Sequence, residues 1–334
     1  MSYWDDCVNM NIATGGKVTE KDFPDDLFIN HVTNTKLLQV SGKKTYLRYL
    51  DTFCTKIMPK KTIWYIINHP KEALAAILKY GENTKGRLGE SLAPRTMVYY
   101  ADVISSLIVH IQQIQENDPS ILKQWRDIKR ILREPVEAQI DTNQPNEQQR
   151  EGIVPYNEFC RIRDNLPDGS QPKILFYLYS MIPVERSDYD QMQIRDEEPS
   201  NMNDGNWLIL GKKNAFYFND FKTAKVYGRI EIPLPKELVN QIHMSLEKEP
   251  RDYLFVNKKG EKYSTANAWN KWANRAIKLL TGNQQIQLRT LRHIYISHLL
   301  KNNDLTRGER KKIAEKMGHT VDTQDKYKWN IEDD

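Results

Sequence analysis

Two arginines in the segment QLRTLRHIYISHLL (287–300) are of a type and spacing that could bind an anion. Arg289 and Arg292 stand three residues apart, and this segment contains no acidic residue. Like charges at that spacing repel on a helix, so a solvated basic face is the alternative interpretation. Planar guanidinium groups bind phosphate in a bidentate manner, which favours convergence of both on a phosphate. Another face of the helix is apolar and gives the helix a reason to pack: Leu288, Leu291, Tyr295 and Leu299.

The next segment, TRGERKKIAEKMGH (306–319), predicts a helix with a defined start and end. Thr306 and Glu309 form a T-x-x-E capping box at its start. Gly318 stands where a left-handed residue commonly ends a helix. His319 would then be held just beyond a rigid helix end, where it could act on a bound group rather than fill space.

Tyr327 follows His319 by eight residues, with seven residues of chain left. Its side chain could simply pack in a groove, but a tyrosine hydroxyl is also a nucleophile that forms covalent intermediates. We expect Tyr327 to lie on a short terminal helix capped by Asp322 or Thr323. Tyr327 is therefore a candidate nucleophile, beside the alternative of a packing tyrosine.

The elements that must position these residues belong to a chain of 334 residues, a length typical of two domains. The net charge of +5 is modest and by itself identifies no partner. Its distribution is more informative, because basic clusters alternate with aromatic residues at 41–48, 58–64, 210–216 and 307–312. That pattern is compatible with binding DNA.

Several classes of protein are excluded by what the sequence lacks. No apolar run approaches the roughly 20 residues of a membrane span, and no signal peptide is recognisable, so we expect an intracellular protein without a membrane partner. Cys7, Cys54 and Cys160 are far apart and are expected to be reduced and structural. We find no P-loop and no set of metal ligands, and we predict neither a cofactor nor a metal.

Residues 135–152 contain two prolines, many polar residues and few apolar ones, which predicts an exposed linker. Helical patterns at 45–57, 94–114 and 119–134 precede it, with Pro94 suited to a first turn. We therefore divide the chain into an unassigned segment at 1–30, an all-α domain at 31–134, the linker, and a second domain at 153–334.

The second domain is predicted to be mainly α with a small antiparallel β-sheet. Segments 155–166 and 173–182 are helical in pattern, and helices resume from 236. Between them, residues 205–235 have the pattern of strands, and the alternation of Ile230, Ile232 and Leu234 puts these three on one face. The stretch TAKVYG is expected to form the turn before that last strand.

These motifs, taken in order, resemble the catalytic domain of tyrosine recombinases of the phage integrase type. That family has H-x-x-R, then G-H, then the nucleophilic tyrosine; this chain has LRTLRHIYISHLL, then MGH, then Tyr327. The resemblance extends over roughly residues 40–330. It implies that the N-terminal helices form a core-binding domain that closes over DNA opposite the catalytic domain.

The resemblance also implies two residues that spacing alone does not identify. Arg186 of IPVERSDYDQM (182–192) matches the first arginine of the family, and Lys222 of the hairpin FKTAKVYGRIEIPL (221–234) best matches its lysine, with Lys225 as the alternative. Arg289 stands where the family most often has histidine, and Tyr189 stands where an acidic residue is usual. The interval of eight residues from Gly-His to tyrosine is one shorter than in most integrases.

By this resemblance the chain is a site-specific DNA recombinase or integrase, from a virus or a mobile element, that cuts and rejoins DNA through a 3′-phosphotyrosyl intermediate. Double-stranded DNA and a homotetramer assembled on it are the implied partners. A type IB topoisomerase, which relaxes supercoils, and a catalytically silent DNA-binding protein of the same fold are the alternatives. The implied catalytic residues are Arg186, Lys222, Arg289, Arg292, His319 and Tyr327.

Overall fold

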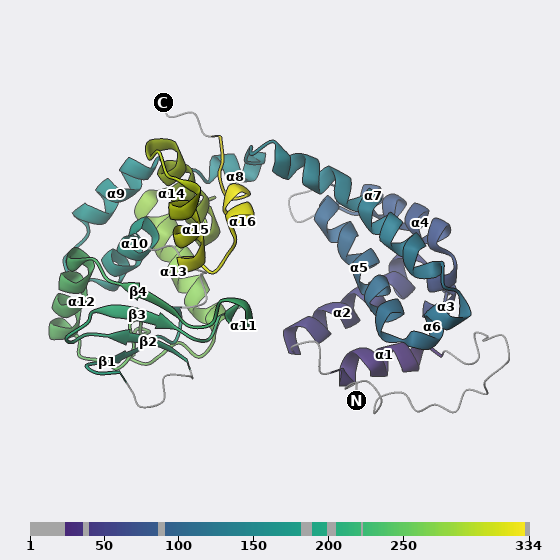
Figure 1. The fold of residues 1–334 in the computed structure, drawn as a ribbon, viewed down its shortest axis with the longest axis horizontal. Helices are drawn as coiled ribbons and strands as arrows, with labels where there is room; N and C mark the ends of the chain where they lie inside the picture. The colour runs from purple at the N-terminus through teal and green to yellow at the C-terminus, as the bar shows by residue number, and fades with distance from the viewer. Residues whose placement is uncertain are drawn as a thin grey trace. The chain divides into compact units, whose positions relative to one another are not determined.

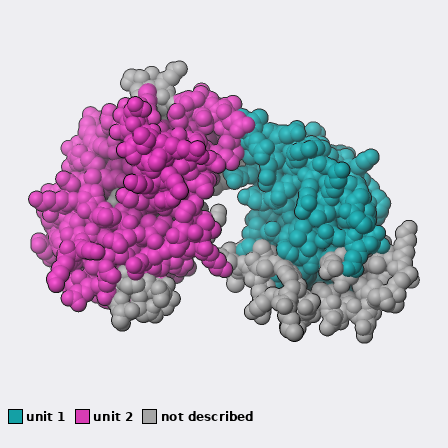
Figure 2. Space-filling model, viewed as in Figure 1, with its two compact units in different colours: residues 1–139 teal, residues 140–334 magenta. Residues whose placement is uncertain are grey.

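The computed structural model describes residues 24–35, 40–85, 91–181, 189–198, 205–221 and 223–330. The chain divides into two compact units, an N-terminal unit of residues 1–139 and a C-terminal unit of residues 140–334 (Figure 2). None of the described helices is both long enough and apolar enough to cross a membrane.

The described part of the N-terminal unit is helical, as the sequence predicts. Its core is built on Trp125, whose side chain is fully buried and whose indole N–H donates to the carbonyl of Ile67 at 2.8 Å. Pro94 opens the fifth helix, where a missing backbone N–H costs nothing. Its elements are α1 (Asp25–Asn34), α2 (Val40–Thr52), a π-helix (Phe53–Ile57), α3 (Ile63–Asn68), α4 (Pro70–Asn83), α5 (Pro94–His110), α6 (Gln112–Asn117) and α7 (Ile121–Asp141).

The segment predicted as a linker, residues 135–152, contains helical structure. The helix α7 continues to Asp141 with Pro135 inside it, and α8 (Glu147–Glu151) follows. The last fully buried residue of α7 is Leu132, and Val136, one turn later, is partly buried against the same core. The sequence pattern therefore predicts the buried part of this helix and misses its polar, exposed continuation.

The C-terminal unit is mainly helical with a small sheet, which confirms the predicted fold class (Figure 1). At its centre α10 (Gln171–Met181) is buried nearly all round and packs against its helical neighbours, as an apolar helix inside a domain does. Besides α8, the other described helices of this unit are α9 (Tyr156–Asn165), α11 (Ala224–Tyr227), α12 (Lys236–Lys248), α13 (Ala266–Thr281), α14 (Leu288–Asn302), α15 (Arg307–Lys316) and α16 (Val321–Asp325).

The sheet has four strands in the order β1 (Gln193–Arg195), β2 (Asn206–Ile209), β3 (Ala215–Phe218) and β4 (Ile230–Pro233). The pairs β2–β3 and β3–β4 are antiparallel, as predicted, but β1 pairs with β2 in parallel and makes the sheet mixed. The strand β1 has three residues, too few to show an alternating pattern. Ile232 is buried and faces the core, in agreement with the predicted alternation.

The connection from β3 to β4 forms the short helix α11 rather than a plain turn. Gly228 follows it with φ of +66°, a conformation that glycine adopts without strain. The helix α15 contacts β4, so the segment that carries the Gly-His pair lies beside this hairpin. The capping box predicted for α15 is present, with both hydrogen bonds between Thr306 and Glu309 formed.

Candidate active site

The C-terminal end of α15 holds His319 in a fixed position. The N–H of His319 donates to the carbonyl of Ala314 at 3.0 Å, and the N–H of Gly318 donates to that of Glu315 at 3.0 Å. These are the two hydrogen bonds of a Schellman motif, and Gly318 has the left-handed φ of +69° that the motif requires. The sequence prediction of a histidine placed by a rigid helix end is therefore confirmed locally.

Arg292 of α14 reaches this turn from the interior of the unit. Its residue surface is only 4% exposed. The Nη2 atom lies 3.3 Å from Nδ1 of His319 and 3.4 Å from the carbonyl oxygen of Met317. One guanidinium thus contacts both the histidine ring and the backbone that carries it.

The contact with Arg292 decides which nitrogen of His319 carries the proton. A guanidinium only donates hydrogen bonds, so Nδ1 of His319 must accept and Nε2 must hold the hydrogen of the neutral ring. Burial, and then the charge of Arg292, lower the pKa of His319 to about 3. The ring is therefore neutral at physiological pH. Its buried Nε2 atom has no hydrogen-bond partner in the described part of the chain.

Tyr327 lies against both of these side chains. Its ring is nearly parallel to that of His319, with centroids 5.6 Å apart and an interplanar angle of 19°. The Cζ atom of Arg292 lies 4.9 Å from the centre of the Tyr327 ring, within the range of a cation–π interaction. Three of the residues singled out from the sequence are therefore in one cluster.

Tyr327 is not placed as the sequence predicted. The helix α16 ends at Asp325, so Tyr327 follows it in a turn, with its N–H donating to the carbonyl of Gln324 at 3.0 Å. The cap is Thr320, whose hydroxyl accepts from the N–H of Thr323, instead of the predicted Asp322 or Thr323. The error arose because the helix begins directly after the Gly-His turn, which shortens the connection.

A second set of contacts, absent from the sequence prediction, anchors the backbone at Tyr327. The Nδ1 atom of His293 lies 2.9 Å from the carbonyl oxygen of Tyr327 and must be its donor. The ring of His293 stacks on Trp329, with centroids 3.9 Å apart, and the N–H of Trp329 donates to the hydroxyl of Ser297 at 2.8 Å. The i, i+4 spacing of His293 and Ser297 puts both on one helical face, but it does not show that the terminal segment packs there.

The environment of His293 keeps its ring neutral as well. Burial is the main cause that lowers the pKa of His293 to about 3, and the charges of Arg289 and Arg292 act in the same direction. The hydrogen bond to the Tyr327 carbonyl opposes them. His293 therefore supports the tyrosine segment as an uncharged donor.

The cluster opens into a cavity of about 340 Å³. Arg292 and Lys316 bring positive charge to its wall, and no acidic residue is among its described lining residues. A positively charged wall with no carboxylate among its described residues suits an anionic ligand. The walls come from the β3–β4 hairpin, the α15–α16 turn, α14 and the terminal segment: Phe218, Phe221, Thr223, Val226, Tyr227, Ile230, Arg292, Lys316, Met317, Gly318, His319, Thr320, Thr323 and Tyr327.

The remaining residues predicted from the sequence are distributed differently. Arg186 and Lys222 lie outside the described residues. Arg289 is exposed in the first turn of α14 and does not line the cavity, and Lys225 is exposed on α11. Tyr189, at the position where the family has an acidic residue, is fully buried among aromatic side chains of the core.

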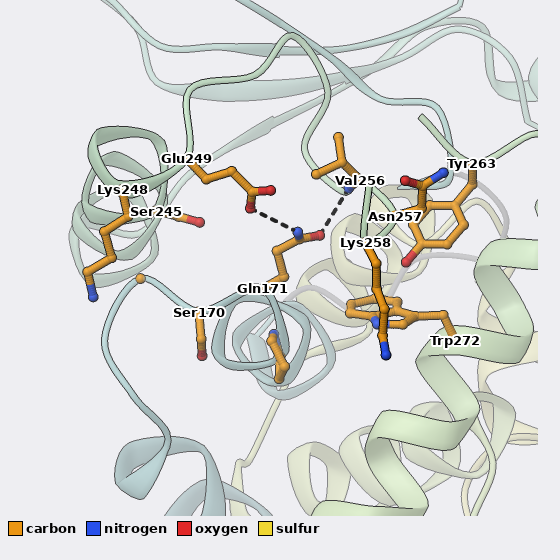
Figure 3. A pocket seen from close by; sticks show the side chains of 12 residues that line it. Ser170, Gln171, Ser245, Lys248, Glu249, Val256, Asn257, Lys258, Tyr263 and Trp272 are labelled. Carbon is orange, nitrogen blue, oxygen red and sulfur yellow. Dashed lines mark hydrogen bonds between the residues drawn. The ribbon is translucent and has the colours of Figure 1, made fainter. Parts of the chain in front are cut away.

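A second cavity in the same unit, of about 500 Å³, lies between the start of α10 and the end of α12 (Figure 3). Polar side chains on two sides of it are hydrogen-bonded within the protein. Gln171 accepts from the N–H of Val256 at 3.0 Å and donates to Glu249 at 3.4 Å, as the dashed lines in Figure 3 show. Lys248 donates to the carbonyl of Asp168 at 2.6 Å. These hydrogen bonds join segments of the fold to one another, which indicates a structural role.

Among the described residues, no cluster of three or more histidine, cysteine, aspartate or glutamate side chains could hold a metal ion. Cys54 and Cys160 are free thiols, and Cys7 lies outside the described residues.

No protein-family model matches the chain, and no curated protein matches it. Among solved structures the chain is similar to a crystal structure of XerA recombinase. The TM-score is 0.40 and the sequence identity is 14%, over 92% of each chain.

Proposed function

We propose that this protein cuts and rejoins double-stranded DNA, with Tyr327 as the nucleophile, and acts as a site-specific recombinase or integrase of the tyrosine class. The observation that carries the proposal is the convergence of Arg292, His319 and Tyr327 on one positively charged cavity. The residue types match the needs of phosphoryl transfer from a DNA diester to a phenol.

In the proposed reaction the phenol oxygen of Tyr327 attacks the scissile phosphorus and forms a phosphotyrosyl ester with the 3′ side of the break. The bond from phosphorus to the 5′-oxygen breaks, and that oxygen takes a proton from Lys222 as general acid. The phenol loses one proton to solvent and Lys222 later regains one, so the step is balanced. The reverse reaction rejoins the strand.

Arg292 and His319 have distinct tasks in this scheme. Negative charge builds up on the non-bridging oxygens in the transition state, and preorganised donors stabilise it there. Arg292 supplies a fixed positive charge, with Arg186 as its proposed counterpart. His319 supplies a neutral Nε2–H donor, because Nδ1 is occupied by Arg292 and the low pKa keeps the ring uncharged. This makes His319 a hydrogen-bond donor and not a general base.

Arg289 cannot replace the histidine of the family as a base, since a guanidinium does not lose its proton in proteins. Its exposed position in the first turn of α14 suits a contact with the DNA backbone beside the scissile phosphate. The energy of the broken diester is kept in the phosphotyrosyl bond, so the scheme requires no nucleotide and no metal.

The proposed assembly on DNA is a homotetramer, because recombination brings two duplexes together and each of the four exchanged strands needs a nucleophile. The topoisomerase alternative requires one protein molecule on one duplex and efficient relaxation of supercoils. Sizing of the protein–DNA complex, with a plasmid relaxation assay on the same preparation, separates the two.

The chemistry is tested with nicked duplexes that carry a randomised central segment, on which a cleaved strand escapes and traps the protein. Wild type is expected to form a DNA adduct that survives denaturing gel electrophoresis, and Tyr327→Phe is expected to form none while it still binds DNA, because phosphate contacts dominate affinity. Tyr253→Phe, outside the cavity, is the matched control. An adduct with Tyr327→Phe would overturn the proposal.

A further inference from the structure

The α15–α16 turn presents two successive carbonyl groups that no N–H of the helix can reach. They belong to Met317 and Gly318, beyond the last residue of α15. Carbonyls at a helix end need partners from elsewhere when they lie inside a protein. Nη2 of Arg292 lies 3.4 Å from the Met317 oxygen, and the hydroxyl of Thr223 donates to the Gly318 oxygen at 2.8 Å.

Thr223 comes from the β3–β4 hairpin, 95 residues earlier in the chain. It is the N-cap residue of α11, where a threonine hydroxyl normally accepts from the first turn of its own helix. Here the Thr223 side chain makes no capping hydrogen bond. The hydroxyl donates instead to the Gly318 carbonyl in the turn that carries His319. A long-range hydrogen bond therefore replaces the local helix cap.

The hairpin and the turn are also in direct van der Waals contact. A Cβ atom placed on Gly318 would lie 3.4 Å from the Thr223 hydroxyl oxygen and 3.4 Å from the ring of Phe221. The hydrogen bond is therefore part of a packed contact that fixes the hairpin at this point. Arg292 contacts the Met317 carbonyl and Thr223 donates to the next carbonyl, that of Gly318. The hairpin and Arg292 are therefore both attached to the same turn.

We propose that Thr223 is a positioning residue that sets the general acid of the hairpin against the phosphate held by Arg292 and His319. This inference rests on the function proposed above. Thr223 directly follows Lys222 in the chain and precedes Lys225 by two residues, so an anchor at Thr223 is adjacent in sequence to either candidate acid. A general acid must come within about 3 Å of the leaving oxygen, which an unanchored hairpin would reach only part of the time.

The test compares Thr223→Val and Thr223→Ala, which remove the donor, with Thr223→Ser, which keeps it. Single-turnover cleavage is measured on ordinary DNA and on DNA whose 5′-bridging oxygen at the scissile phosphate is sulfur, a leaving group that needs no proton. On ordinary DNA we expect Thr223→Val and Thr223→Ala to cleave about tenfold or more slowly than wild type, as misplacement of a catalytic group does. Thr223→Ser should cleave at close to the wild-type rate. On the sulfur substrate both donor-free variants should cleave at the wild-type rate.

Two results would overturn the inference. Thr223→Val that cleaves ordinary DNA as fast as wild type would show that the hydrogen bond has no part in catalysis. Equal slowing on both substrates would show that Thr223 only supports the turn of His319 and not the acid. A wild-type protein that forms no adduct on either substrate would instead overturn the proposed function, and the inference with it. Thr223 is half-buried on the hairpin, and thermal melting of each variant identifies any loss of folding.

Discussion

The cavity beside Gln171 and the cavity beside Tyr327, both in the C-terminal unit, differ in a way that volume does not reveal. The larger one, beside Gln171, has polar groups that already bond one another, and its wall includes the carboxylate of Glu249. The smaller one has positive charge, no described carboxylate, and a buried Nε2–H of His319 with no described partner. A buried donor without a partner costs free energy unless a ligand supplies one. The candidate active site is therefore distinguished by a buried polar group without a described partner, and not by the volume of its cavity.

The largest effect is expected from substitution of Arg292, whose buried guanidinium brings positive charge to the wall of the smaller cavity. Arg292→Lys keeps the charge but loses the guanidinium fork and its fixed geometry, so we expect adduct formation to slow by about 10²-fold or more. Arg275→Lys, at an exposed position on α13, controls for the change of residue type. If Arg292→Lys cleaved DNA at the wild-type rate in a single turnover, the proposed role of the Arg292 guanidinium in catalysis would be wrong.

His319 is expected to matter as a donor. His319→Gln keeps an N–H group in place of Nε2–H and should cleave clearly faster than His319→Ala, which we expect to be slower than wild type by about tenfold to 10²-fold. Since the pKa of His319 is lowered to about 3, the wild-type rate should show no titration of this residue between about pH 5 and pH 8. A pH–rate inflection near the ordinary histidine pKa of about 6.5 that disappears in His319→Gln would contradict the donor role.

Sequence analysis is most successful for parts of this site that depend on neighbours in the chain. The capping box of α15 and the glycine that ends it are set by residues close to each end of that helix, and both are present. The contacts of Trp329 with His293 and Ser297 join residues that are far apart in the chain. Nothing in their spacing shows that the terminal segment returns to α14, so the support of Tyr327 could not be predicted.

The same limit applies to the hairpin. Its antiparallel strands follow from alternation, but the bond between Thr223 and Gly318 depends on how the hairpin packs against α15. The parallel pairing of β1 with β2 depends on a short strand with no pattern of its own. Arg289 and Arg292 illustrate the point inside one helix, because one is exposed and the other, less than one turn later, is 4% exposed.

A smaller effect is expected for His293, which supports the tyrosine segment without lining the cavity. Its pKa of about 3 in the folded protein lies below the roughly 6.5 of an unfolded chain. Its contribution to stability is therefore complete above about pH 6.5 and is lost as the pH falls from there toward 3. Between about pH 7 and pH 5 that loss amounts to about 2 kcal/mol for one such histidine.

His293→Asn keeps a donor for the Tyr327 carbonyl but does not titrate in this range. Its unfolding free energy in urea should therefore fall by about 2 kcal/mol less than that of wild type between about pH 7 and pH 5. The same substitution at the exposed His243 is the control. An unchanged pH dependence in His293→Asn would show that the His293 ring is not held neutral.

The smallest effect on catalysis is expected from the larger cavity. Gln171→Ala removes the amide that links Val256 to Glu249, which should lower stability by about 1 kcal/mol, mainly through the partly buried hydrogen bond from the N–H of Val256. Cleavage of DNA should be unaffected at a temperature where the variant is folded. A selective loss of cleavage with normal stability would assign a functional role to this cavity and reverse the comparison.

The central claim is that Tyr327 becomes covalently joined to DNA, and mass spectrometry of the trapped adduct tests it most directly. The adduct is digested with nuclease and protease, and the residue that carries the nucleotide is identified. We predict a single modified residue, Tyr327, linked to a 3′-phosphate. A nucleotide on any other residue, or a phosphate attached through its 5′ side, would contradict the account.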